Sequence, residues 1–183
     1  MSPEKLSSTS ICSCSGGDRD RRPRRGRPIE GEPGGERLTG SYAVIVGIGQ
    51  DAAGDDGIGL AVARALIARG VPARPCADAS VLLPLFAEGR RVVLIDAVIG
   101  AAPGTVMQLD PDALATGPAP VSSHGLGVRE AIALGRTLYG AVAIAIVGIA
   151  IDPPREARVG LSAAVEAAIA PASALASALA TGG

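Results

Sequence analysis

Three side chains in this sequence have the types and the settings expected of a metal site: Asp56, Asp96 and His124. Asp56 is the second of two adjacent carboxylates in a glycine-rich loop, Asp96 ends an apolar run, and His124 is the only histidine of the chain. Carboxylate and imidazole together are suitable ligands for nickel, zinc and similar divalent ions. The sequence therefore predicts a divalent-cation site, provided that the fold brings these three residues to one place.

The loop that carries Asp56 lies between a predicted strand and a predicted helix. Residues 43–46 form a continuous apolar run that stops at Gly47, which is typical of a strand covered on both faces. Apolar residues then recur at helical spacing over residues 58–66. Because a helix N-terminus favours carboxylates, one of Asp55 and Asp56 could simply cap this helix while the other works in the site.

Asp96 ends a second fully apolar strand, which is predicted over residues 91–96. Ligands of open α/β sheets bind beyond the carboxyl ends of the strands, so Asp96 should share one rim with the loop of Asp56. His124 stands at or just before a helix predicted by the apolar stripe over residues 128–138. Each residue also has a purely structural explanation, as a helix cap, a solvated strand end and a turn residue respectively.

The rest of the chain alternates between short apolar strands and amphipathic helices. This alternation predicts a single α/β domain over residues 41–183. One proline is tolerable in the first turn of a brief helix, and a second should kink or interrupt the last helix. The predicted segments are a strand over 71–77, a helix over 81–87 with Pro84, an extended edge segment over 104–109, a Pro/Gly-rich loop leading to His124, a buried strand over 141–151, and a last helix with Ser162 as N-cap and Pro171 inside it.

Composition and charge limit the classes of function. Of the 183 residues 48% are hydrophobic, but with two Tyr, one Phe and no Trp the chain lacks the aromatic platforms on which single-strand and RNA binders stack bases. Residues 41–183 carry 9 basic and 12 acidic side chains, which is a poor surface for nucleic acid. We therefore expect no nucleic-acid partner.

The cysteines and the N-terminal residues indicate the cellular setting. Cys12, Cys14 and Cys76 form no even, spaced framework, which fits a reducing cytoplasm better than secretion. Cys76 ends a predicted interior strand, where the thiol should be buried and inert. The sequence has no run of about 20 apolar residues and no apolar signal-peptide centre, so we expect a cytoplasmic protein without a membrane partner. Residues 1–40 are rich in Ser, Gly, Pro and Arg and predict a disordered tail.

A second motif in the glycine-rich loop leaves an alternative open. GIGQDA at residues 47–52 follows a strand and matches the G-x-G-x-x-G/A dinucleotide fingerprint. A pyrophosphate there would face Asp51, Asp55 and Asp56, and a carboxylate about 4 Å from a phosphate costs about 1–4 kcal/mol. The helical pattern also begins only after Gly57. A Rossmann-type nucleotide-binding protein is therefore the second-ranked interpretation.

Four blocks of sequence, in the same order, resemble the hydrogenase maturation protease family, the endopeptidases that trim the large subunit of nickel-iron hydrogenases. The blocks are GIGQDAAGDDGIGLAVARAL, VVLIDAVIGAAPGTVMQLD, SSHGLGVREAIALGRTL, and VGIAIDPP followed by GLSAAVEAAI, and they cover about residues 42–180. The resemblance implies a three-layer α/β sandwich with a mostly parallel twisted sheet flanked by helices. Gln50 and Asp51-Ala52-Ala53 depart from the family pattern, which usually has Asn and then a Pro or apolar pair.

The same resemblance implies roles for the candidate residues. Asp56, Asp96 and His124 match the family's metal-binding positions, with nickel carried by the partner, an immature hydrogenase large subunit. The implied activity is a peptidase that removes a C-terminal peptide from that precursor, with Asp56 or Asp96 as general base or with the metal polarising the scissile carbonyl. We expect the enzyme to be a monomer. A non-catalytic, metal-sensing maturation chaperone of the same fold is the remaining alternative.

Overall fold

The computed structural model describes residues 43–116, 126–153 and 159–182, all of which belong to the unit Thr39–Gly183. The tail predicted over residues 1–40 and the segment that carries His124 lie outside the described residues.

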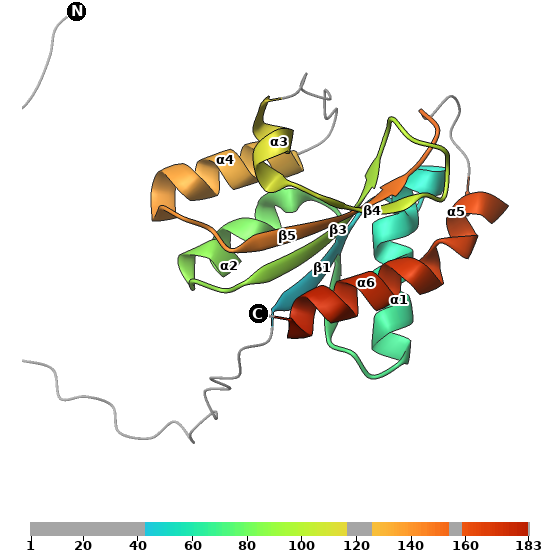
Figure 1. Ribbon diagram of the computed structural model, residues 1–183, viewed down its shortest axis with the longest axis horizontal. Coiled ribbons are helices and arrows are strands. Elements are labelled where there is room, and N and C mark those ends of the chain that lie inside the picture. The colour runs from blue at the N-terminus through green and yellow to red at the C-terminus, as the bar shows by residue number, and fades with distance from the viewer. Residues whose placement is uncertain (1–42, 117–125, 154–158, 183) are drawn as a thin grey trace, which may run out of the picture. The chain divides into compact units, whose positions relative to one another are not determined.

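A single sheet forms the centre of the described residues. Its strands are β1 (Val44–Ile48), β2 (Ala73–Cys76), β3 (Val92–Val98), β4 (Val106–Leu109) and β5 (Ile144–Ala150). They are ordered β2-β1-β3-β5-β4 (Figure 1). All neighbours pair in parallel except β4, which runs antiparallel to β5 at one edge. The predicted mostly parallel sheet and its extended edge segment are thus confirmed.

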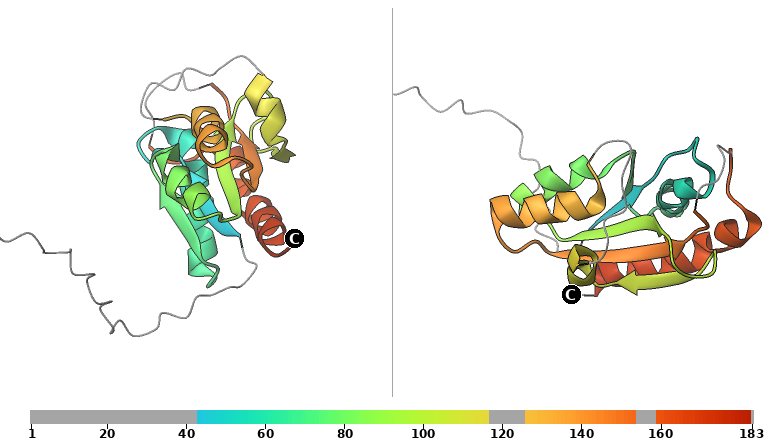
Figure 2. Two further views of the ribbon diagram at one scale, coloured as in Figure 1. Left: turned by 90° about the vertical axis from the view of Figure 1, so that its left-hand side faces the viewer. Right: turned by 90° about the horizontal axis from the view of Figure 1, so that it is seen from above.

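Helices cover both faces of this sheet (Figure 2). One face is covered by α1 (Ile58–Ala68), α5 (Ala163–Ala167) and α6 (Ile169–Thr181), and the other by α2 (Leu82–Ala87) and α4 (Val128–Tyr139). The short helix α3 (Pro111–Thr116) lies beside α4, and two 3-10 turns, η1 (Gly54–Gly57) and η2 (Ala79–Val81), precede α1 and α2. This arrangement is the three-layer sandwich that the resemblance implied.

Side-chain alternation along the strands explains the continuous apolar runs. In β3, Val93 and Ile95 belong to the core under α1 and α6, whereas Val92 and Leu94 belong to the core under α2 and α4. All four side chains are completely buried. A strand with a core on each side needs apolar residues at every position, so the period of two disappears from the sequence.

Two glycines let α1 lie directly on the sheet. A Cβ atom at Gly59 would lie 2.1 Å from the carbonyl oxygen of Ile48 and 2.7 Å from that of Ile95, and one at Gly47 would lie 2.0 Å from the carbonyl oxygen of Gly59. No side chain fits at either position. The close approach holds the start of α1, and therefore η1 with its carboxylates, beside the ends of β1 and β3.

Two strands differ from the sequence prediction in ways that affect candidate residues. β3 continues to Val98 because its last residues pair with β5, so Asp96 lies inside the strand and not at its end. β2 is an edge strand rather than an interior one, and the Cys76 thiol is half-buried instead of fully buried. Burial still raises the pKa of this thiol.

A helix that was not predicted occupies part of the expected Pro/Gly-rich loop. Asp110 precedes α3, and its carboxylate accepts a hydrogen bond of 2.9 Å from the amide of Asp112. Pro111 is the first helical residue, where its missing N–H and its fixed φ are favourable. An ion pair of 2.6 Å between Asp112 and Arg136 links α3 to α4.

The last helix is interrupted before Pro171 rather than at it. α5 ends at Ala167 and α6 begins at Ile169, which places Pro171 in the first turn of α6. A proline ring clashes with the carbonyl four residues earlier, here that of Ala167, and this accounts for the position of the break. Ser162 is the N-cap residue, as predicted, but its side chain makes no capping hydrogen bond.

The C-terminal helical segment is apolar and belongs to the core. Ala163–Thr181 is long and apolar enough to cross a membrane by length and composition alone. One face of it packs into the core that it shares with α1 and the sheet, through Ala172, Ala176 and Ala180. Because a core helix passes the same test, this segment is weak evidence for a membrane span, and the expected absence of a membrane partner stays a prediction.

Candidate metal and catalytic site

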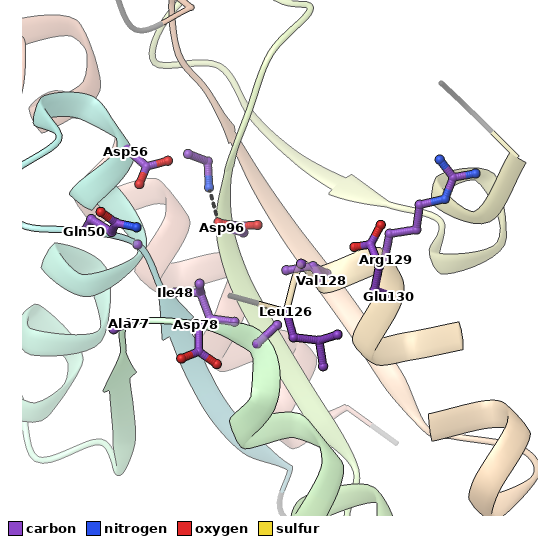
Figure 3. A pocket seen from close by; sticks show the side chains of 14 residues that line it. Ile48, Gln50, Asp56, Ala77, Asp78, Asp96, Leu126, Val128, Arg129 and Glu130 are labelled. Carbon is purple, nitrogen blue, oxygen red and sulfur yellow. Dashed lines mark hydrogen bonds between the residues drawn. The ribbon is translucent and has the colours of Figure 1, made fainter. Parts of the chain in front are cut away.

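A cavity of about 240 Å³ lies at the carboxyl ends of β1 and β3, and both predicted carboxylates line it (Figure 3). In the sheet β1 has β2, the next strand in sequence, on one side and β3 on the other, so the strand order reverses here. Such switch points are the usual ligand sites of open α/β sheets. The cavity therefore lies where the sequence predicted a site, between the loop of Asp56 and the strand of Asp96.

Asp56 is presented by η1, the tight turn between β1 and α1. A Cβ atom at Gly49 would lie 2.2 Å from the Asp56 carbonyl oxygen, so the turn closes this tightly only over a glycine. Neither η1 nor α1 has a side-chain cap hydrogen bond, so the Asp56 carboxylate caps neither of them. The alternative that Asp56 is simply a helix cap is therefore wrong.

Asp96 projects from β3 on the side of the sheet covered by α2 and α4, because it has the same parity as Leu94. One of its carboxylate oxygens accepts a hydrogen bond of 2.9 Å from the N–H of Ala97. Burial raises the pKa of Asp96 to about 7; the Ala97 hydrogen bond opposes this shift and the charge of Asp56 adds to it. The half-buried Asp96 is not the solvated strand end of the structural alternative.

The two carboxylates share one cavity whose lining holds more acidic side chains than basic ones. Figure 3 shows the Asp56 carboxylate directed towards Asp96 across the cavity. Burial raises the pKa of Asp56 as well, against the lowering effect of the Gln50 N–H. Two facing carboxylates with raised pKa values can bind a divalent cation, which would stabilise both charges, or can hold and transfer a proton.

A third protein ligand does not lie in the described part of the chain. Among residues 43–116, 126–153 and 159–182, no group of three or more His, Cys, Asp or Glu side chains is arranged to hold a metal ion. His124, the third predicted ligand, lies outside these ranges, so its role stays a prediction. Asp56 and Asp96 fit a cation as an incomplete oxygen-ligand pair that leaves positions open for other donors.

Sequence reasoning missed the opposite wall of the cavity. It is formed by Asp78 after β2 and by Leu126, Arg129 and Glu130 at the start of α4. Asp78 caps η2 by accepting a hydrogen bond of 2.7 Å from the Ser80 amide. The Ser80 side chain and, to a smaller extent, the Ser80 amide lower the pKa of Asp78. Asp78 could have been found, because it follows the carboxyl end of a parallel strand as Asp56 does. The α4 residues join the cavity only through tertiary packing.

The rim of the loop is fixed by an ion pair outside the cavity. Arg64 of α1 donates to both carboxylate oxygens of Asp51, each at 2.6 Å, and both side chains are more than half exposed. α1 itself begins only at Ile58, after η1. This late helix start does not favour the dinucleotide interpretation, which needs the helix N-terminus directly behind the first glycines.

Solved structures with the same architecture define the class to which this fold belongs. [NiFe] hydrogenase maturation protease HybD from Thermococcus kodakarensis is 24% identical over 76% of this chain and 99% of that chain, with a TM-score of 0.63, and at this identity it supports the fold alone. The Escherichia coli hydrogenase maturating endopeptidase HybD is 27% identical over 77% of this chain and 94% of that one, with a TM-score of 0.59. HycI from Thermococcus kodakarensis KOD1 is 26% identical over 78% and 93%, with a TM-score of 0.57. The fold is that of the maturation proteases.

A family model makes the assignment more specific. The HycI hydrogenase maturation protease model matches residues 77–178, which is more than half of the chain. The chain therefore belongs to the hydrogenase maturation protease family, and the resemblance found in the sequence is confirmed. The matched range includes Asp96 and His124, whereas Asp56 precedes it. None of the curated protein sequences gives a significant match.

Proposed function

We propose that this protein is an endopeptidase that removes the C-terminal peptide of a nickel-loaded [NiFe]-hydrogenase large-subunit precursor. The observation that carries the proposal is the pairing of Asp56 and Asp96 in one cavity at the reversal point of the sheet. Membership in the family supplies the reaction class, a peptidase of hydrogenase maturation. We further propose that it acts as a cytoplasmic monomer without nucleic-acid or membrane partners.

In this proposal the nickel ion arrives with the substrate. Asp56, Asp96 and His124 would contact it while the precursor supplies the remaining ligands, and the ion would polarise the scissile carbonyl. Asp96 is also suited to act as general base, since its pKa of about 7 allows it to accept a proton from water near neutral pH. Asp56 is the second candidate for this role because its carboxylate faces the same space.

Nickel carried by the substrate allows the enzyme to distinguish a precursor that has received its nickel from one that has not. An empty precursor would bring no positive charge to the two carboxylates, whose raised pKa values reflect the cost of keeping them ionised in the cavity. A loaded precursor would offset that cost. Discrimination is then a difference between two binding free energies, and it requires no separate sensor.

The decisive experiment combines chelator-stripped, desalted enzyme with the precursor in nickel-free and nickel-loaded forms. We expect a single cut near the C-terminus of the loaded precursor and none in the empty one, followed as a shift in subunit mass. Asp56→Asn and Asp96→Asn should each slow cleavage by about 100-fold or more, as loss of a general base or metal contact does. Asp112→Asn, which removes an exposed carboxylate of α3, is the matched control and should leave the rate unchanged.

Other outcomes identify the alternatives. Equal cleavage of both precursors would contradict substrate-borne gating. An enzyme that stripping inactivates and added metal alone restores would be an ordinary metalloprotease with its own ion. If neither precursor is cut although the loaded one binds to the Asp56 and Asp96 site, the protein is the non-catalytic metal-sensing chaperone.

A further inference from the structure

We propose that Asp55 is a positioning residue, which holds the Asp56 turn in place by anchoring it to the start of α5. The two adjacent aspartates of η1 then have different tasks. Asp56 lines the cavity, whereas Asp55 is absent from the cavity lining and makes its contact on the C-terminal segment. The assignment rests on the proposed function only in that the positioned group, Asp56, is the one to which we give a role in the reaction.

A single long-range hydrogen bond carries this inference. One carboxylate oxygen of Asp55 accepts a hydrogen bond of 2.5 Å from the backbone N–H of Ser162, and the contact is partly buried. Hydrogen bonds to an ionised acceptor are shorter and about twice as strong as neutral ones. The bond joins residues 107 positions apart in the sequence, so it fixes η1 to the start of α5, a distant segment of the chain.

The Ser162 amide, which anchors Asp55, is itself held in place by packing. Leu161, next to Ser162, packs against the core under α1 and α6. On the other side, a Cβ atom at Gly104 would lie 2.3 Å from the Ala164 carbonyl oxygen, so the turn before β4 is in direct contact with α5. The Ser162 amide therefore presents its N–H from a rigid position, and a carboxylate bound to it is held as well.

The Ser162 hydroxyl provides an internal control. Its oxygen is buried and has no hydrogen-bond partner among the described residues, although Ser162 is the N-cap residue. The side chain thus contributes nothing to the contact with Asp55, which depends on the backbone amide alone. Ser162→Ala should retain the anchor. Ser162→Pro should remove it, because proline has no N–H and the φ of −69° at this position suits a proline ring.

The substitution series separates positioning from chemistry. Asp55→Asn keeps an acceptor oxygen for the Ser162 amide, whereas Asp55→Ala removes it. If Asp55 were a metal ligand or a base, both variants would fail alike, as we expect for Asp56→Asn and Asp56→Ala. For a positioning residue, Asn should restore most of what Ala loses.

The first readout needs neither metal nor substrate. The Asp56 amide, which donates a hydrogen bond to the Ala53 carbonyl within the turn, reports the position of the turn through its hydrogen-exchange rate by NMR. We expect exchange at the Asp56 amide to accelerate by about tenfold or more in Asp55→Ala and Ser162→Pro, and to stay near the parent rate in Asp55→Asn and Ser162→Ala. The double variant Asp55→Ala/Ser162→Pro should be no faster than either single variant, because both remove the same bond.

The second readout is cadmium or nickel affinity by calorimetry. We expect about tenfold weaker binding in Asp55→Ala and Ser162→Pro, the usual effect of losing a residue that orients a ligand, and recovery to within about threefold in Asp55→Asn. Parent-like exchange at the Asp56 amide in Asp55→Ala would overturn the inference, as would equal losses in Asp55→Asn and Asp55→Ala. A parent protein that binds no metal would contradict the proposed site, while the exchange series would still decide the role of Asp55.

Discussion

The ionised form of Asp96 is costly to the native state. Its pKa rises from 3.8 to about 7, chiefly through burial, whereas an unfolded chain would give it an ordinary value. A shift of this size corresponds to about 4 kcal/mol of unfavourable free energy once the group is ionised in the folded protein. Burial of Asp96 therefore lowers the stability of the folded protein, and it also provides a carboxylate that can exchange a proton near neutral pH.

This cost predicts a pH dependence of folding stability. The folded state binds the Asp96 proton more tightly than the unfolded state, so the contribution is fully favourable below about pH 4 and is lost as the pH rises through about 7. Asp96→Asn should abolish this loss and raise the free energy of unfolding by about 2–4 kcal/mol at pH 8 relative to the parent, while changing it far less at pH 4. Urea unfolding between pH 4 and 8 measures the difference.

The exposed carboxylate of Asp112 provides the control for this measurement. Asp112→Asn should follow the parent curve at every pH, because its ion pair with Arg136 lies at the surface. If Asp96→Asn has the same pH profile as the parent, Asp96 does not carry a raised pKa, and its selection as a general base loses its physical support.

The convergence of Asp56 and Asp96 could be predicted from the sequence because Asp56 follows β1 and Asp96 lies near the carboxyl end of the parallel strand β3. Parallel strands end at the same edge, so the rule needs no tertiary detail. What could not be predicted is that Asp56 lines the cavity while its neighbour Asp55 accepts a hydrogen bond from the Ser162 amide. This difference depends on the orientation of η1 relative to segments that are distant in the sequence, which the local sequence pattern does not determine.

At the scale of elements, contact between α1 and the sheet depends on the absence of side chains at Gly47 and Gly59. Gly59→Ala would place a methyl group 2.1 Å from the Ile48 carbonyl oxygen, and only a shift of the helix could relieve the overlap. We expect a loss of at least about 3 kcal/mol in the free energy of unfolding, at or above the usual cost of overpacking a core. The displaced turn should also lower metal affinity. Chemical unfolding and calorimetry measure the two effects.

Arg64→Ala in the same helix is the matched control for the glycine substitution. It removes an ion pair with Asp51 in which both side chains are largely exposed, and should cost less than about 1 kcal/mol. A Gly59→Ala variant as stable as Arg64→Ala would show that α1 can move away from β1 without penalty.

Elements defined by local pattern were predicted well, whereas the extension of a strand through pairing was not. α1 follows from apolar periodicity and β1 from a continuous apolar run, and both agree closely with the sequence prediction. The extension of β3 to Val98 depends on its partner β5, and no residue within β3 marks it. α3 was the avoidable omission, because Asp110 and Pro111 form a local helix-start signal inside a stretch judged to be loop.

At the scale of the molecule, the N-terminal segment differs in composition from the rest of the chain, since residues 1–40 are rich in Ser, Gly, Pro and Arg. Among the residues that the structure describes, the two hydrophobic clusters extend from Ala43 to Ala180. We therefore expect deletion of residues 1–38 to leave the free energy of unfolding within about 0.5 kcal/mol of the parent value, as for changes away from the core. Cleavage of loaded precursor should also be unchanged. A truncated protein that unfolds without cooperativity or loses cleavage would show that the segment contributes to the fold or to partner binding.

The position of Pro75 in β2 affects how these molecules behave when concentrated. β2 is an edge of the sheet, and an edge with free backbone donors is a template on which another chain can add a strand. Pro75 has no N–H to offer, and its neighbour Arg74 is exposed and charged. Both features oppose edge-to-edge association. In a protein with 48% hydrophobic residues and an almost neutral net charge, two residues of one short strand thus make this edge of the sheet a poor template for aggregation.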